Sequence, residues 1–578
     1  MPITGSECEE AVYSEAYIDY IADYTINAET FRQMYDDICV QYINDSEAAI
    51  YERYSGEEFL INKRGYRAFP KCYGLLDNEA LVESGILRLR RQPFFNLTGQ
   101  GVLVAVIDTG IDFRHPAFVQ PDNTTKIVAA WNQADRSGEP PEGIIYGTEY
   151  TREDINRALA ADGNNGGNAG LQADSSFNAA GLDGLAYNSE HGTSIAGIAA
   201  GREVEEADFS GAAPLAELVI VKLKEAKQVF RNYYRISDNA TAFQENDVML
   251  AVTYVLNVAR RLRRPIVICM GIGTNQGDHN GLGPLSDYLN LITLNPGVYV
   301  CTAAGNETGK GHHFRSNVLT FDEYQDVDIY VGGSSGGFTA ELWGGTATLF
   351  AVAVKPPIGE FTGLIEARFN EKRSFNFLLS NTILEISAEI FEGSSGDELL
   401  FFRFINPAEG LWTIRVFQKS TQPGIFDMWL PMEDFLDGVT VFLSPDPDVT
   451  ICEPGNTTNV ITFAGSSVTG KSLYVNSSRG FTRSGRVKPD ITAPAVGVYT
   501  AVQNGRFEGV TGTSMAAGIG SGAVALIAEW SLRNTIVSNA TAKKYLIRGA
   551  DREGLVVPDT SWGWGRLDLY SSFVSIGE

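Results

Sequence analysis

The amino-acid sequence predicts an α/β fold: a doubly wound parallel sheet, with a small α+β unit in front of it and an all-β domain inserted into it. Short apolar runs bounded by turn residues are typical of buried parallel strands. Such runs occur at residues 101–107, 215–222, 265–270, 297–303 and 460–465. Helical periodicity separates them, most clearly over 246–264. Alternating strands and helices favour a doubly wound sheet.

A change of pattern marks the insertion. Between residues 314 and 450, alternating runs are separated by Gly, Pro and Asn clusters, and helical periodicity is weak. This pattern is typical of a β-sandwich. The α/β pattern then resumes and continues to the end of the sequence. We therefore expect one α/β domain formed by 78–313 and 451–578 and interrupted by 314–450.

Residues 1–77 are acidic and are expected to form the small α+β unit. Two stretches, 14–24 and 28–44, have helix-like patterns, and a strand-like segment follows at 58–69. The first residues lack a basic stretch followed by an apolar run, so no secretory signal is expected. No apolar run reaches the roughly 18 to 20 residues that span a bilayer.

The composition restricts the partners. The 578 residues carry a formal net charge of −26, which argues against nucleic acid or an anionic membrane as a partner. Solubility alone is the plainer explanation of this charge. The six cysteines show no CxxC spacing, so neither a zinc site nor a disulfide scaffold is expected. Cys269 and Cys301 lie in apolar runs and are predicted to be reduced core residues. No cofactor is expected.

Three residues suited to nucleophilic hydrolysis lie on short motifs at the ends of predicted strands and helices. Asp108 follows a buried strand in VIDTG, His191 opens HGTSIAG, and Ser514 lies in GTSMAA. A serine nucleophile needs an imidazole to take its proton and a carboxylate to orient that imidazole. Taken singly, these residues also fit a loop aspartate, a structural histidine and a helix cap.

Asn306 is the candidate for a fourth role. It follows a buried strand in AAGNE, where a side-chain amide can donate to a developing oxyanion together with the backbone N–H of Ser514. Alone, an asparagine after glycine fits a turn. The order Asp, His, Asn, Ser is similar to that of the subtilisin-like (S8) serine proteases. The segments GAAP at 211–214 and KPDITAP at 488–494 also resemble this family.

The resemblance covers the two stretches expected to form the α/β domain. It implies a serine endopeptidase that forms an acyl-enzyme with a protein or peptide substrate. It also implies that the substrate pairs as an extra strand against an edge of the domain. The residues implied to line the substrate pocket lie at two strand ends and are Gly271, Ile272, Gly273, Ala303, Ala304 and Gly305.

Further features resemble one branch of the family, the germination-associated Csp subtilases of spore-forming clostridia. These features are the short N-terminal unit, the β-rich insertion and the stretches 484–494 and 545–570. The resemblance implies a jelly-roll insertion, a cleaved propeptide that stays bound, and activation of a spore-cortex hydrolase precursor. It implies a spore-associated or cytoplasmic location, with unconventional export left open. A commensal housekeeping or host-interacting subtilase is the alternative role.

The resemblance also implies processing. Counting back from Asp108 makes residues 1–77 a propeptide that Ser514 cuts in cis. The cut is expected within a short region that consists of Gly74, Leu75, Leu76, Asp77 and Asn78.

Two positions depart from the family pattern. Ala117 stands where a calcium-binding aspartate is usual, so no metal ligand is carried over, and Gly518 replaces a usual proline without removing a catalytic group. The intact Asp108, His191 and Ser514 disfavour a regulatory pseudoprotease. An esterase or lipase is disfavoured because the serine comes first in its usual order of serine, acid and histidine, whereas it comes last here.

Overall fold

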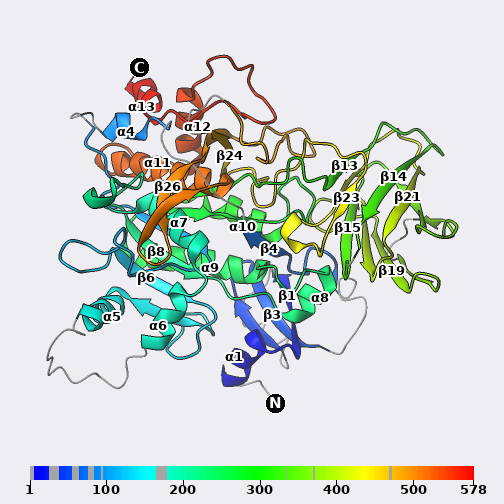
Figure 1. Cartoon of the computed structure of the whole chain (residues 1–578), viewed down its shortest axis with the longest axis horizontal. Helices are drawn as coiled ribbons and strands as arrows, with labels where there is room; N and C mark the ends of the chain where they lie inside the picture. The colour runs from blue at the N-terminus through cyan, green and yellow to red at the C-terminus, as the bar shows by residue number, and fades with distance from the viewer. Residues whose placement is uncertain are drawn as a thin grey trace.

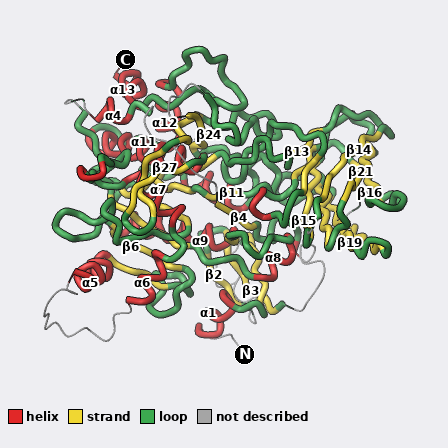
Figure 2. The backbone as a smooth tube through the Cα atoms, viewed as in Figure 1, coloured by secondary structure: helices red, strands yellow, loops and turns green. Residues whose placement is uncertain are grey.

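The structure of the chain is a computed structural model with three parts (Figure 1, Figure 2). Figure 1 shows the α/β domain on the left, the insertion on the right and the N-terminal sheet, in blue, at the lower centre. The structure describes residues 5–24, 38–54, 64–75, 84–90, 92, 95–163, 179–333, 335–366, 368, 371–467 and 472–577.

An eight-stranded sheet forms the centre of the α/β domain. Its neighbouring strands are parallel except for the last pair, which is antiparallel. All the apolar runs expected to be strands lie in this sheet, so the predicted doubly wound sheet is confirmed. In spatial order, the strands are β25 (Ile491–Val496), β24 (Ile461–Ser467), β12 (Val298–Ala303), β10 (Ile266–Met270), β5 (Leu103–Asp108), β8 (Glu217–Lys222), β6 (Ile127–Asn132) and β7 (Thr148–Thr151).

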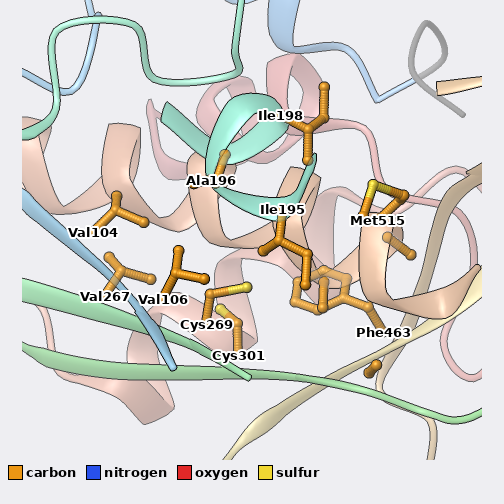
Figure 3. Close-up of a cluster of buried hydrophobic side chains, with 14 of the residues drawn as sticks. Val104, Val106, Ile195, Ala196, Ile198, Val267, Cys269, Cys301, Phe463 and Met515 are labelled. Atoms are coloured by element: carbon orange, nitrogen blue, oxygen red, sulfur yellow. The ribbon is translucent and has the colours of Figure 1, made fainter. Parts of the chain in front are cut away.

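Helices cover both faces of this sheet, because alternate residues of each strand are apolar on both sides. Val104 and Val106 of β5 share a core with α7 (Glu190–Ala200) and α11 (Thr513–Arg533), as Figure 3 shows. The other apolar residues of β5 share a second core with α9 (Glu245–Leu262). Both α7 and α11 therefore begin at the edge of the sheet where β5 ends.

The remaining helices lie around this core. Among the described residues, α11 is the one helix long and apolar enough to cross a membrane, but 89% of its apolar window is buried inside the protein. A hairpin of β26 (Val498–Val502) and β27 (Arg506–Val510) leads into α11. The other helices are α4 (Ile86–Arg90), α5 (Arg152–Gly163), α6 (Ala179–Ala186), η1 (Glu205–Ala207), α8 (Gln228–Tyr234), α10 (Pro284–Ile292), α12 (Asn539–Gly549) and α13 (Leu569–Gly577).

The N-terminal unit is a helix on a three-stranded antiparallel sheet. It consists of α1 (Gly5–Tyr13), β1 (Tyr17–Asp23), β2 (Cys39–Tyr42) and β3 (Glu47–Arg53), with β3 in the middle. A disulfide links Cys8 to Cys39. The expectation of no disulfide scaffold is corrected to one bridge within this unit. Cys269 and Cys301 are buried and reduced, as predicted.

Local predictions for the N-terminal unit were partly wrong. The helix expected over 14–24 is strand β1, because pairing with β3 and burial on both faces override its weak helical pattern. Much of 28–44 lies outside the described residues, and its end is strand β2 rather than helix. The described part of the strand expected over 58–69 forms turns.

The insertion is a β-sandwich, as the sequence predicts. Its core lies between two antiparallel sheets and includes Phe338, Phe402 and Trp412. The first sheet is β13 (His313–Arg315), β22 (Asp427–Trp429), β15 (Gly337–Trp343), β20 (Leu399–Ile405), β19 (Thr382–Glu389) and β18 (Glu371–Phe377). The second is β17 (Ile365–Glu366), β16 (Phe350–Lys355), β21 (Gly410–Gln418), β14 (Tyr324–Val331) and β23 (Thr440–Phe442), and a short η2 (Glu433–Phe435) lies between β22 and β23.

Candidate active site

Asp108 and His191 meet where β5 ends and α7 begins. Asp108 is the last residue of β5 and is fully buried. Nδ1 of His191 lies 2.9 Å from both carboxylate oxygens of Asp108. Thr109 donates its backbone N–H to Oδ1 of Asp108 at 2.7 Å. A carboxylate held in this way keeps the proton of the neutral imidazole on Nδ1 and leaves Nε2 as the base.

A glycine allows α7 to approach β5 this closely. A Cβ atom on Gly192 would lie 2.2 Å from the carbonyl oxygen of Gly110 and 3.2 Å from Cβ of Asp108. The backbone N–H of Gly192 donates to Oγ1 of Thr109 at 3.1 Å. The motif HGTS therefore combines the histidine with the one residue type that fits between the helix and the strand.

Ser514 lies beside the imidazole at the start of α11. A Cβ atom on Gly271, at the end of β10, would lie 3.1 Å from Cβ of Ser514 and 3.2 Å from Cε1 of His191. The side chains of Ser514 and His191 therefore both adjoin Gly271 and lie next to each other. Ser514 is fully buried and His191 is 7% exposed. Three residues that are distant in the sequence thus meet at one edge of the parallel sheet.

Asn306 faces the start of the same helix. Its Oδ1 accepts hydrogen bonds from the backbone N–H and the hydroxyl of Thr513, at 3.3 and 3.2 Å. The Thr513 hydroxyl in turn accepts the backbone N–H of Gly305 at 3.1 Å. These contacts fix Oδ1 as the acceptor end of the amide, so Nδ2 is the end that can donate to an oxyanion.

A strand of the chain itself occupies the position expected for a substrate strand. The strand β4 (Cys72–Leu75) is antiparallel to β11 (Ile272–Gly273), with Leu75 opposite Ile272 and Gly74 opposite Gly273. On its other side β4 pairs with β9 (Phe243–Gln244). Gly74 and Leu75, which belong to the predicted cleavage region, therefore lie next to the candidate pocket. Leu76, Asp77 and Asn78 lie outside the described residues.

The second predicted wall of the pocket consists of Ala303, Ala304 and Gly305. Cys452, which follows the insertion, donates its backbone N–H to Ala304 at 2.9 Å. A Cβ on Gly305 would lie only 2.4 Å from Sγ of Cys452, so this thiol closes the back of the wall. Its neighbour Glu453 forms a pair of backbone hydrogen bonds with Thr274. The sequence contained no signal for Cys452, because only the fold places it here.

Lys222 is a second residue that sequence reasoning missed. It stands opposite Asp108 in the register of β5 and β8. Its ammonium donates to the carbonyl oxygens of Thr109, at 2.7 Å, and Tyr187. Burial lowers the pKa of Lys222 to about 8, although Glu225 and Asp108 favour its charged form. The lysine therefore fixes the turn after Asp108 against the segment that precedes α7.

The residues that the structure describes contain no group of three or more His, Cys, Asp or Glu side chains able to hold a metal ion. Ala117, which stands where the family has a calcium ligand, is fully buried.

The comparisons identify the class of protein. The subtilase family model matches residues 99–336 and 443–565, which is more than half of the chain. The chain therefore belongs to the subtilase family of subtilisin-like serine peptidases. The interval between the two matched stretches lies within the insertion.

Solved and curated relatives narrow the resemblance. The CspB protease of Clostridium perfringens matches with a TM-score of 0.71 and 26% sequence identity, over 85% of this chain and 95% of that one. The C5a peptidase of Streptococcus pyogenes serotype M6 is 24% identical over 447 residues, which is 74% of this chain. This chain spans 34% of the length of that peptidase. The resemblance to Csp subtilases seen in the sequence is thus confirmed.

Proposed function

We propose that Ser514 is the nucleophile of this endopeptidase, with His191 as its general base and Asp108 as the residue that orients the base. The contact of Nδ1 of His191 with both oxygens of Asp108, with the ring beside Ser514, carries this proposal. Because Asp108 is fully buried, its charge can stabilise the imidazolium that forms during the reaction.

The proposed reaction has two halves. Oγ of Ser514 attacks the scissile carbonyl carbon while Nε2 of His191 takes the hydroxyl proton, and the imidazolium then gives this proton to the leaving amine. Water then attacks the acyl-enzyme with His191 again as base, the ester bond to Oγ of Ser514 breaks, and the imidazolium returns the proton to Oγ. The negative oxygen is stabilised by Nδ2 of Asn306 and by the backbone N–H of Ser514, since the first N–H groups of a helix point out of its end.

A fluorophosphonate probe tests the nucleophile. We expect the mature protein to be labelled at Ser514, and the label to be absent from Ser514→Ala and strongly slowed in His191→Ala. Peptide mapping locates the label. Folded protein from which the propeptide has been removed and which still refuses the probe would favour a regulatory pseudoprotease instead.

We further propose that the chain processes itself. The pairing of β4 with β11 resembles that of a bound substrate strand. Leu75 stands opposite Ile272, whose neighbour Gly271 adjoins Ser514. This register predicts that the bond between Leu76 and Asp77 is cut, and that residues up to Leu76 are the propeptide.

N-terminal sequencing and intact mass of the purified protein test the processing. We expect a mature chain that begins at Asp77 and a full-length Ser514→Ala variant. If the Ser514→Ala variant yields the same short form without an added protease, self-cleavage is wrong. A different new N-terminus would reject the cut between Leu76 and Asp77.

For the biological role, we propose limited cleavage of a spore-cortex hydrolase precursor in a spore-associated location. The likeness to the CspB protease over most of both chains supports this role. The test is incubation of mature protein with such a precursor, followed by mapping of the cut. Cleavage of C5a in a parallel assay, with the precursor left intact, would favour a host-directed role like that named for the streptococcal relatives.

A further inference from the structure

Residues 64–71, here called the arm, connect the N-terminal unit to β4. The place where β4 lies beside β11, near Ser514, is here called the catalytic cleft. Tyr66 lies in the middle of the arm and is only 2% exposed. Its ring packs edge-on against Trp343 of β15, with a centroid distance of 5.6 Å, and against Phe401 of β20 at 6.2 Å. The outer face of one sheet of the insertion therefore covers this aromatic ring.

Polar contacts hold the same residue. The hydroxyl of Tyr66 donates to Oε1 of Glu341 at 2.6 Å, and its backbone N–H donates to Oε1 of Glu389 at 3.0 Å. Both glutamates belong to the insertion. The next residue, Arg67, donates to Oγ of Ser394 in the insertion at 3.0 Å. Tyr66 is thus bound at its ring, its hydroxyl and its backbone.

The opposite side of the arm packs on the α/β domain. Phe69 is fully buried among three aromatic rings of α8, the nearest of which is Tyr233 at 4.7 Å. Arg67 donates to Asp287 of α10 at 2.9 Å. Tyr233 also stacks on Phe401, at 5.8 Å, so the insertion and the α/β domain contact each other next to the arm.

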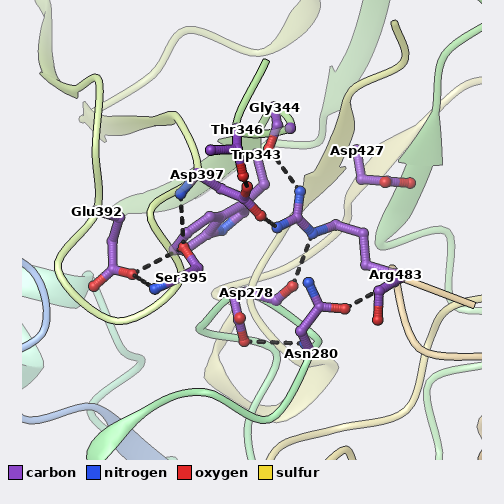
Figure 4. Close-up of polar contacts among 12 residues, drawn as sticks. Asp278, Asn280, Trp343, Gly344, Thr346, Glu392, Ser395, Asp397, Asp427 and Arg483 are labelled. Atoms are coloured by element: carbon purple, nitrogen blue, oxygen red, sulfur yellow. Dashed lines mark hydrogen bonds and ion pairs between the residues drawn. The ribbon is translucent and has the colours of Figure 1, made fainter. Parts of the chain in front are cut away.

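Arg483 of the α/β domain fixes the insertion in this position. Figure 4 shows its guanidinium among residues of the two domains. It donates to the carbonyl oxygens of Gly344 at 2.7 Å and Asp278 at 2.9 Å, and it pairs with Asp397. Its charge also lies over the ring of Trp343, at 5.7 Å. Arg483 therefore connects the surface that contacts Tyr66 to the α/β domain.

We propose that the outer face of this sheet, formed by Glu341, Trp343, Glu389 and Phe401, is a docking surface for the arm, with Tyr66 as its anchor, and that it keeps the cleaved propeptide on the enzyme. This inference rests on the proposed processing. Buried aromatic side chains at the centre of an interface carry much of its binding energy. The insertion thereby adds a binding contact that is separate from the strand pairing in the catalytic cleft.

The cleft alone is a poor retention device for the cleaved propeptide. Over the residues that the structure describes, β4 forms two residue pairs with each neighbouring strand, and an enzyme must release product strands from this position. The N-terminal sheet has a separate contact with the α/β domain, where buried Asp19 pairs with Lys227. Within the arm, Tyr66 and its neighbour Arg67 are the residues through which the insertion adds to that contact.

The experiment measures the lifetime of the complex between the two fragments. A Ser514→Ala chain with an inserted site for an added protease after Leu76 gives the same fragments without self-cleavage. The lifetime can therefore be measured by size-exclusion chromatography and intact mass whether or not the chain processes itself. N-terminal sequencing of the native chain reports the processing separately.

We expect Tyr66→Ala to shorten this lifetime by at least about tenfold, because anchors of interfaces act mainly on dissociation. Tyr54→Ala is the matched control, since Tyr54 belongs to the same unit and is 37% exposed. On the insertion, Phe401→Leu is expected to shorten the lifetime by about three- to tenfold. In the double variant with Tyr66→Ala, it should not shorten the lifetime further than Tyr66→Ala does alone. Tyr330→Leu, on the other sheet of the insertion, is its control.

Equal lifetimes for Tyr66→Ala and Tyr54→Ala would overturn the docking surface. Independent, additive effects of Tyr66→Ala and Phe401→Leu would show that the two residues do not act through one contact. If Tyr66→Ala does not fold, Tyr66→Phe and Phe401→Leu decide, and unchanged lifetimes for both would reject the proposal.

Discussion

Two of the contacts between the N-terminal unit and the rest of the molecule use different chemistry. In the cleft, β4 contacts β11 and β9 through backbone pairing, with Leu75 opposite Ile272. Along the arm, the contacts are made mainly by side chains, with Tyr66 against Trp343 and Glu341. Backbone pairing accepts many sequences, whereas a buried tyrosine between matched partners accepts one. A protease needs the first property at its cleft, and a retained propeptide needs the second elsewhere.

The largest expected effect comes from a substitution that removes the nucleophile from the cleft and leaves the arm unchanged. Ser514→Ala should lower kcat by about 10⁶-fold, a magnitude known from subtilisin, a member of the same family, rather than derived from this structure. The arm contacts should be unchanged, because Ser514 does not touch them. Peptidase assays with a fluorogenic peptide, after removal of the propeptide, measure the first effect. A residual rate near the native one would remove Ser514 from the mechanism.

Asn306→Ala should have the next largest effect. Loss of one oxyanion donor lowers kcat by about 100- to 1,000-fold, again a value known from subtilisin. The variant should fold, and its thermal midpoint should stay close to that of the native protein, because Asn306 is only half-buried. A KM close to the native value is expected, because the donor acts on the transition state. A normal kcat would show that Nδ2 does not face the oxyanion.

Gly192→Ala tests whether the close approach of α7 to β5 positions the base. The added Cβ would lie 2.2 Å from the backbone oxygen of Gly110, and no side chain can move to relieve this contact. A small displacement of His191 should lower kcat/KM by about 100-fold. Gly509→Ala is the control, since its Cβ would have nothing within 4 Å. Equal activities for the two variants would contradict the positioning role.

The smallest effect concerns pH and should act on the arm rather than on the cleft. Burial raises the pKa of Glu341 to about 7, although Tyr66, Gly277, Trp343 and Lys71 favour its charged form. Burial also raises the pKa of Glu389 to about 7, against the backbone hydrogen bond from Tyr66, and the charge of Glu392 adds to the increase. The bound state therefore holds protons that the separated fragments, with ordinary carboxyl pKa values, release.

Retention should consequently be strongest at low pH and weaken as pH rises towards 7, with no further loss from these groups above that value. We expect the lifetime of the two-fragment complex to shorten by about tenfold between pH 5.5 and 8. The double variant Glu341→Gln with Glu389→Gln should flatten this profile. A native profile that rises with pH, or an unchanged slope in the double variant, would refute the assignment.

Much of the α/β domain could be predicted because its signals are local. The apolar run that ends at Asp108 is a buried strand by composition alone, and His191 and Ser514 each lie on a motif of contiguous residues. The N-terminal unit lacked such signals. Residues 17–23 became strand β1 only through pairing with β3, a partner that no local pattern indicates.

The sequence by itself determined the class of sheet, the inserted β-sandwich and the residues suited to hydrolysis, because periodicity and short motifs are properties of neighbouring residues. Only the tertiary structure decided which distant residues meet. Cys452 closes the wall at Gly305, and Tyr66 reaches Glu341 across 275 residues of chain. Such contacts depend on how the strands and the inserted sheet pack in space, and side-chain packing between distant segments leaves no periodic trace in a single sequence.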